Sequence, residues 1–340
     1  MHRARYGARG ACALTLSLVL TACGGENGGS SGGSGSDDPD RVLSTGGQRV
    51  SKIFQDLDLN GTTDIVTSFT YNANERTMVM EAVYSDDGVA DEFRFGDETI
   101  RHTVSTVTFS ENGNLQSSVS ENTHADGSSS SVSFVHGYTG GKITSINQDI
   151  VSPGASVSFG LQAQYDSGIL SGFTFDNGAF SGGWVLDYLD GLLDTATYSV
   201  NNTISYTASY AWRGDGQFQG IEITKPNSSD ISALTTVYSD EGVLQSATRS
   251  DSNSPDYVLN NFTAHYIYDS EGKIERIDYD PLSTGTVKAS ERYEWEDGDC
   301  MEFYGFSSGS TSIPHHSASG TEIFPAGVFS RMPICAPAEE

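Results

Sequence analysis

The segment Tyr268-Asp-Ser-Glu-Gly272-Lys-Ile274 decides the fold, because its pattern recurs along most of the chain. An aromatic residue is followed by a short polar turn that ends in glycine, and an apolar residue follows that glycine closely. The nine turn glycines are spaced 23 to 30 residues apart and are Gly88, Gly113, Gly141, Gly168, Gly191, Gly216, Gly242, Gly272 and Gly298. This spacing indicates a repeat architecture with a period of about 26 residues.

Each unit of the repeat predicts a β-hairpin. Glycine supplies the positive φ of a tight turn, while Asp, Asn and Ser side chains satisfy the backbone groups of the turn. The aromatic residue before the turn and the apolar residue after it should then lie opposite each other as a cross-strand pair. Beyond the turn, apolar residues recur two apart, as Phe173 and Phe175 do, and this alternation is typical of strands.

The sequence therefore predicts an all-β fold, an antiparallel meander of repeated hairpins over residues 41–300. Two strands of roughly nine to ten residues fit each unit. About eighteen strands exceed what an open twisted sheet tolerates, so the sheet must curl, close or coil. We predict a curled or superhelical single sheet. A membrane-spanning barrel is the alternative, but Lys273–Tyr279 places charges on both faces of its strand, which argues against a continuous lipid-facing surface. We also expect short acidic turns along one edge and longer polar loops along the other.

One copy of the repeat resembles a known family. The stretch His265–Ile277 is similar to the YD repeat of the RHS family, in which Tyr-x-Tyr-Asp-x-x-Gly is followed by a basic and then an aliphatic residue. The resemblance covers roughly residues 80–300 and implies a coiled β-sheet in an extracytoplasmic setting. It implies no activity, since fold does not specify function.

The N-terminus predicts export. Three arginines precede the apolar run 11–20, which has half the length that a bilayer-crossing helix needs. The segment Leu20-Thr21-Ala22-Cys23 resembles the lipobox of bacterial lipoproteins, and this resemblance implies a signal peptide over residues 1–22 and a lipid on Cys23. Gly24 differs from the aspartate associated with inner-membrane retention, so the resemblance implies the outer membrane. The Gly- and Ser-rich residues 23–40 then form a flexible linker. An ordinary secretory signal with a chance cysteine is the alternative.

The net charge narrows the kinds of molecule that the chain can bind. The chain has a formal net charge of −27, and removal of the three signal arginines makes the mature chain more acidic still. An anionic surface of this kind excludes nucleic acid as a partner and suits divalent cations.

Cys300 and Cys335 are the cysteines left after the signal and the lipidated residue, and we predict that they form a disulfide that ties residues 301–340 back to the repeats. Two free thiols or a metal pair are the alternatives.

A calcium site is the best candidate for chemistry. Asp56, Asp58, Asn60 and Asp64 place oxygen ligands around Gly61 in the pattern Asp-x-Asp-x-Asn-Gly. Thr67 stands where an EF-hand needs a glutamate, so a calcium loop of extracellular β-proteins is the closer match. Because Gly61 precedes Gly88 by about one repeat, the loop could equally be the first hairpin tip.

These features predict an outer-membrane lipoprotein, facing the periplasm or the cell surface, that acts as a structural or binding module for protein or carbohydrate partners. We expect no catalysis, and calcium is the only cofactor indicated. The alternatives are a secreted carboxylate-dependent hydrolase of the glycosidase type and an accessory subunit of an envelope complex. The motif Gly305-x-Ser307-x-Gly309 matches a nucleophile elbow only by its letters, since no α/β sheet is predicted around it.

Overall fold

The protein folds into a closed antiparallel β-barrel, as a computed structural model shows. The structure describes residues 43–44, 48–73, 75–85, 100–110, 115–176, 178, 180–214, 216–252, 261–298 and 300–301. The strands are β1 (Leu43–Ser44), β2 (Gln48–Asp56), β3 (Ile65–Asn72), β4 (Thr77–Tyr84), β5 (Ile100–Phe109), β6 (Leu115–His124), β7 (Ser129–Thr139), β8 (Lys142–Ser152), β9 (Ala155–Asp166), β10 (Ile169–Asp176), β11 (Ser181–Leu189), β12 (Leu192–Val200), β13 (Thr203–Trp212), β14 (Phe218–Thr224), β15 (Ile231–Tyr238), β16 (Leu244–Asp251), β17 (Phe262–Tyr268), β18 (Ile274–Pro281), β19 (Ala289–Asp297) and β20 (Cys300–Met301).

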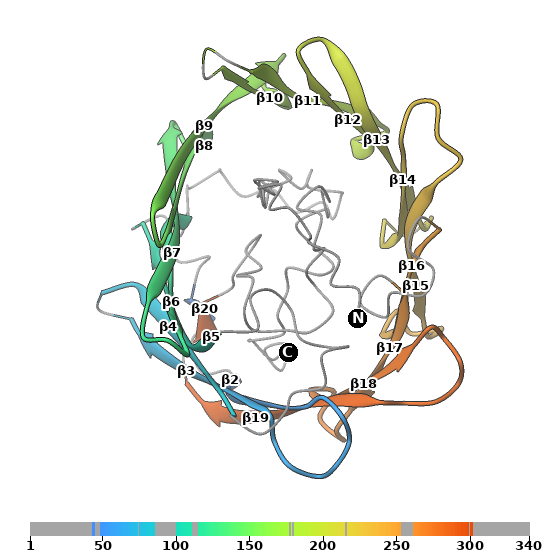
Figure 1. The fold of residues 1–340 in the computed structure, drawn as a ribbon. Coiled ribbons are helices and arrows are strands. Elements are labelled where there is room, and N and C mark those ends of the chain that lie inside the picture. The colour runs from blue at the N-terminus through green and yellow to red at the C-terminus, as the bar shows by residue number, and fades with distance from the viewer. Residues whose placement is uncertain are drawn as a thin grey trace, which may run out of the picture.

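Strands β2 to β19 follow one another round a ring in chain order, and β19 lies beside β2 (Figure 1). The predicted meander of about eighteen strands is confirmed, but the prediction of a curled or superhelical sheet is wrong, because the sheet closes. Beyond the barrel, β1 pairs with β20 in a separate two-stranded sheet. No helix in the described part of the chain is long and apolar enough to cross a bilayer.

The hairpins explain the repeat. Aromatic and apolar residues face each other across the turns as predicted, for example Tyr138 with Ile143 and Tyr268 with Ile274. Gly272 has a φ of 80°, in the left-handed region that favours glycine. The register shifts directly before the aromatic residue, so each such hairpin contains a β-bulge in the strand that follows the turn. Bulges increase the local twist and bend of a strand, which is a physical reason for closure.

A hydrogen bond ties each of several units to the unit before it. The aromatic side chain that precedes a turn donates its O–H or N–H to the carbonyl of the apolar residue that follows the preceding turn. The bonds are Tyr165 Oη to Ile143 O at 2.9 Å, Trp212 Nε1 to Leu193 O at 2.7 Å, Tyr268 Oη to Leu244 O at 2.7 Å, and Trp295 Nε1 to Ile274 O at 2.9 Å. This inter-repeat latch explains why both positions recur with one period.

The barrel has two rims. Turns that follow odd-numbered strands, such as Asp190-Gly191, lie at one end, which we call the hairpin rim, and turns that follow even-numbered strands lie at the other end, the loop rim. The loop rim includes the longer connections 57–64, 225–230 and 282–288. The turn at Gly61 lies at the loop rim, and Tyr84 ends β4 at the same rim, while the rest of its copy of the repeat lies outside the described residues. The turn at Gly61 is therefore out of phase with the later copies, which turn at the hairpin rim.

The two faces of the wall differ in polarity. Met78, Phe173 and Ile277 belong to the buried face, where they are at most 1% exposed. The other face presents charged side chains, such as Glu81 and Arg292, each 54% exposed. Side chains of neighbouring strands converge only on the concave side of a closed sheet, so the buried apolar face is the inner one. A barrel that spans a bilayer has the opposite arrangement, with an apolar band outside.

Candidate metal site at the loop rim

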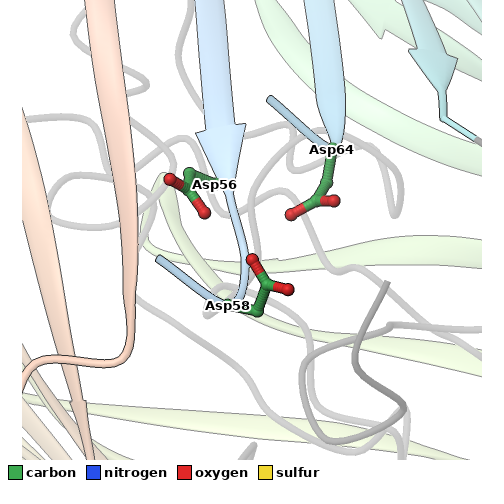
Figure 2. A group of neighbouring side chains, drawn as sticks. All are labelled: Asp56, Asp58 and Asp64. Carbon is green, nitrogen blue, oxygen red and sulfur yellow. The ribbon is translucent and has the colours of Figure 1, made fainter. Parts of the chain in front are cut away.

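Three aspartates meet where β2 ends and β3 begins. Asp56 is the last residue of β2, Asp58 lies in the connecting loop, and Asp64 directly precedes β3. Each offers a carboxylate oxygen, and these oxygens all lie within 4.8 Å of one another. Figure 2 shows the carboxylates of Asp58 and Asp64 turned toward each other between the two strand ends, with the carboxylate of Asp56 beside the end of β2. Three of the four predicted ligands are therefore brought together.

The loop is held in shape by its own polar groups. Asp56 Oδ2 accepts the Gly61 N–H at 3.0 Å, and Gly61 has a φ of 84°. Asn60, the fourth predicted ligand, instead donates its Nδ2 to Asp58 Oδ2 at 2.9 Å and accepts the Thr62 N–H at 2.7 Å. Asn60 therefore positions Asp58 within the loop, and its role as a ligand stays a prediction.

Asp64 is the most constrained member of the group. It is 2% exposed, its Oδ2 accepts the Leu57 N–H at 2.7 Å, and its backbone N–H donates to Gln55 O at 2.8 Å. Burial raises the pKa of Asp64, the hydrogen bond from Leu57 opposes that rise, and the negative charges of Asp58 and Asp56 add to it. Without a cation, the group therefore stores electrostatic repulsion at neutral pH.

One oxygen of the group lacks a partner. Asp56 Oδ1 is buried and makes no hydrogen bond within the described residues. A buried carboxylate oxygen without a donor is costly, and a cation would satisfy it. Hard oxygen ligands of this kind suit Ca²⁺, which takes six to eight of them, so backbone oxygens or waters would complete the shell.

The other predicted sites lie at the margins of the described structure. Cys300 begins β20, where it pairs with Ser44, and Cys335 lies outside the described residues, so their disulfide remains a prediction. Cys23 also lies outside the described residues. Sequence reasoning missed one neutral polar cluster on the inner wall, around His136, because single serines and histidines on a strand give no recognisable motif.

Comparisons with known proteins add little about function. No known protein family matches the chain, and no curated protein matches it. The lipobox and YD resemblances thus remain predictions. Among solved structures, the chain is similar to a porin-like protein from Bacteroides uniformis, with 11% sequence identity and a TM-score of 0.38 over 73% of this chain and 96% of that chain. A similarity at this level carries no information about activity.

Proposed function

We propose that this chain is a lipid-anchored β-barrel module of the outer membrane that displays its loop rim to a binding partner. The geometry of the chain ends carries the proposal. The first residue of β2, Gln48, pairs with Asp297 at the hairpin rim, and β1 and β20, which adjoin these two strands in sequence, pair with each other. A tether from Cys23 therefore joins the barrel at the hairpin rim. The loop rim then points away from the membrane, and loops on a rigid scaffold are common binding elements.

The polarity of the wall supports a barrel that stands in water. Charged residues on the outer face include Glu81, Arg276 and Arg292. Exposure to lipid at the bilayer midplane would cost about 2–4 kcal/mol for each arginine and less for the glutamate. A barrel of this polarity needs a separate anchor to remain at a membrane. Several acyl chains on one cysteine supply it, since each buried methylene contributes about 0.8 kcal/mol.

The anchor is tested by replacing Cys23. In cells that express the full chain, the wild type should incorporate labelled palmitate and sediment with membranes until detergent releases it. Cys23→Ser should lose the label and become soluble, whereas the matched Cys12→Ser variant, altered within the signal, should behave as wild type. Sedimentation of Cys23→Ser with membranes after a salt wash would contradict the proposed anchor.

The carboxylate group favours a second component of the function, calcium binding that orders the loop rim. With a dissociation constant of about 10⁻⁴ M, typical of weak extracellular sites, 10 mM calcium would stabilise the barrel by about 2.7 kcal/mol. The raised pKa of Asp64 fixes the sign of the pH effect. Without calcium, the contribution of Asp64 to the free energy of unfolding falls as pH rises from 3.8 through the folded-state pKa of Asp64. Bound calcium would offset this loss of stability.

Calorimetric titration after dialysis against a chelator tests this component. The wild type should release or take up heat with calcium and melt at a higher temperature in its presence. Asp58→Asn should weaken binding at least tenfold, while Asp230→Asn, a control at the same rim, should leave it unchanged. Absence of both heat and melting shift in the wild type would refute calcium binding.

We expect no catalysis from this arrangement. A glycosidase acid needs a raised pKa and access to substrate. Asp64 has the raised pKa, but it is 2% exposed and its Oδ2 is already committed to the Leu57 N–H. The binding module is therefore better supported than the hydrolase.

A further inference from the structure

The inner wall formed by β5, β6, β7 and β8 is unlike the rest of the inner face. The strand pairing places a series of hydrogen-bonding side chains there, and none of the inward positions from Thr103 to Ile150 is acidic or basic, apart from histidines. The series consists of Thr103, Ser105, Ser118, Ser120, Asn122, His124, Ser130, His136 and Gln148. A chain with 45 acidic residues has thus kept this surface free of carboxylates.

The part of this series near the loop rim is satisfied internally. Thr103 Oγ1 donates to Asn122 Oδ1 at 2.8 Å, and Ser105 and Ser120 share a hydrogen bond of 2.8 Å. These pairs cross from β5 to β6 and satisfy four of the inward polar side chains of the two strands. They explain why polar residues at these positions are compatible with a stable wall.

The part nearer the hairpin rim is not satisfied in the same way. Ser118 Oγ is buried and makes no hydrogen bond to any described residue. Both ring nitrogens of His136 are buried and make no well-formed hydrogen bond there, although the backbone of Gln116 lies near enough to oppose the lowering of the His136 pKa. Ser118 is 1% exposed and His136 is 6% exposed. Both flank Phe134, which pairs with Ser118 on one side and with Gln148 on the other. An unsatisfied buried polar group costs about 1–3 kcal/mol, so the positions are expensive unless something else bonds to them.

The chemistry of the cluster selects a neutral partner. Burial lowers the pKa of His136 to about 4, so its imidazole is neutral at pH 7 and offers one donor and one acceptor. The serine hydroxyl also offers both. A charged ligand would meet no opposite charge on this wall and would lose its hydration. Phe134 belongs to the core of this wall, and the partly buried Tyr138 packs against that core on the same face of β7.

We propose that this wall binds a neutral, polyhydroxylated ligand, such as a glycan chain, whose hydroxyl groups bond to His136 and Ser118. Hydroxyl groups donate and accept at once, as the cluster requires. The inference rests on the proposed role as a binding module and names the class of its ligand.

Calorimetric titration of the full mature chain, made soluble by Cys23→Ser, tests the proposal with maltohexaose, cellohexaose and chitohexaose as probes. At least one should bind at up to 1 mM. Ser118→Ala should weaken that binding at least fivefold, and His136→Phe should abolish it. Ser117→Ala is the matched control, because Ser117 neighbours Ser118 in sequence and faces the outside of the barrel.

Two outcomes would overturn the proposal. One is the absence of binding to all three hexasaccharides by a chain whose circular dichroism shows the folded barrel. The other is binding that neither Ser118→Ala nor His136→Phe weakens. Because Ser118→Ala removes only one hydroxyl, it gives an answer even if His136→Phe fails to fold. Failure of the Cys23 anchor in cells would leave this result unchanged, so the two proposals fail separately.

Discussion

Gly183 in β11 gives the sharpest test of the barrel geometry. Its φ is 154°, and a Cβ added there would lie 2.0 Å from Phe173 O and 2.9 Å from Thr174 Cα of the neighbouring β10. Non-bonded heavy atoms settle at about 3.5 Å, so β10 and β11 would have to separate by roughly 1.5 Å to admit a methyl group. Both obstructing atoms belong to the backbone, so no rotation of a side chain can relieve the overlap.

The cost of Gly183→Ala follows from that separation. Overpacking of this kind costs about 1–3 kcal/mol, and loss of one or two ladder hydrogen bonds adds about 1 kcal/mol each. We expect destabilisation by about 3–5 kcal/mol, against a total stability of about 5–15 kcal/mol. Gly214→Ala should change stability by less than about 0.5 kcal/mol, since nothing lies within 4 Å of its added Cβ. Gly191→Ala, equally open but with a φ of 81°, should cost about 1 kcal/mol.

Urea unfolding followed by tryptophan fluorescence measures all three variants, and Trp184 reports directly because it follows Gly183 in β11. The midpoint should fall in the order Gly214→Ala, Gly191→Ala, Gly183→Ala, with an unchanged slope. If Gly183→Ala were as stable as Gly191→Ala, the close approach of β10 and β11 would be wrong.

Two further predictions concern the latch and the inner wall. Tyr268→Phe removes the donor to Leu244 O and should lower the free energy of unfolding in urea by about 1 kcal/mol. Tyr198→Phe is the control and should be nearly neutral, because the Tyr198 hydroxyl makes no hydrogen bond within the described structure. Equal losses in the two variants would contradict the latch. The pKa of His136 is about 4 in the folded state and 6.5 in the unfolded state. Its contribution to the free energy of unfolding should therefore be complete above pH 6.5 and be lost as pH falls through 4, and the total loss should be on the order of 3 kcal/mol. Stability measured from pH 7 to pH 4 should show this loss in the wild type and a smaller one in His136→Phe; identical pH profiles would refute it.

The hairpin itself could be predicted from sequence, because its determinants are local. The turn glycine, the polar turn residues and the facing pair of Tyr268 and Ile274 all lie within seven residues. The carboxylates of Asp56, Asp58 and Asp64 could be grouped for the same reason. The bonds that Asn60 makes within its own loop could not be predicted in the same way, because a regular spacing does not reveal how an amide is oriented.

The bulge also had a sequence signal, one that strand alternation hides. Ile274 and Ile277 both reach the core although they are three residues apart, and the register shift between them and β17 accounts for the extra residue. Leu193 and Ala196 show the same spacing after Gly191. A strand that strictly alternates would have turned the second residue outward. Two apolar residues three apart, directly after a turn glycine, therefore indicate a bulged strand.

Closure depended on residues that no local pattern connects. A bulge repeated at one rim bends the sheet but does not say whether its ends meet or pass each other, as the superhelical prediction assumed. The ends meet because β2 and β19 are complementary: Arg49 Nε lies 2.8 Å from Glu296 Oε1, and the buried Gln55 donates to Glu291 Oε1 at 2.7 Å. We call the pairing of β2 with β19 the seam. In a chain this acidic, two acidic edges would repel each other, so a cation opposite Glu296 stabilises the closed barrel more at the seam than it would elsewhere. The seam thus selects the closed barrel, and its partners lie more than 230 residues apart in sequence.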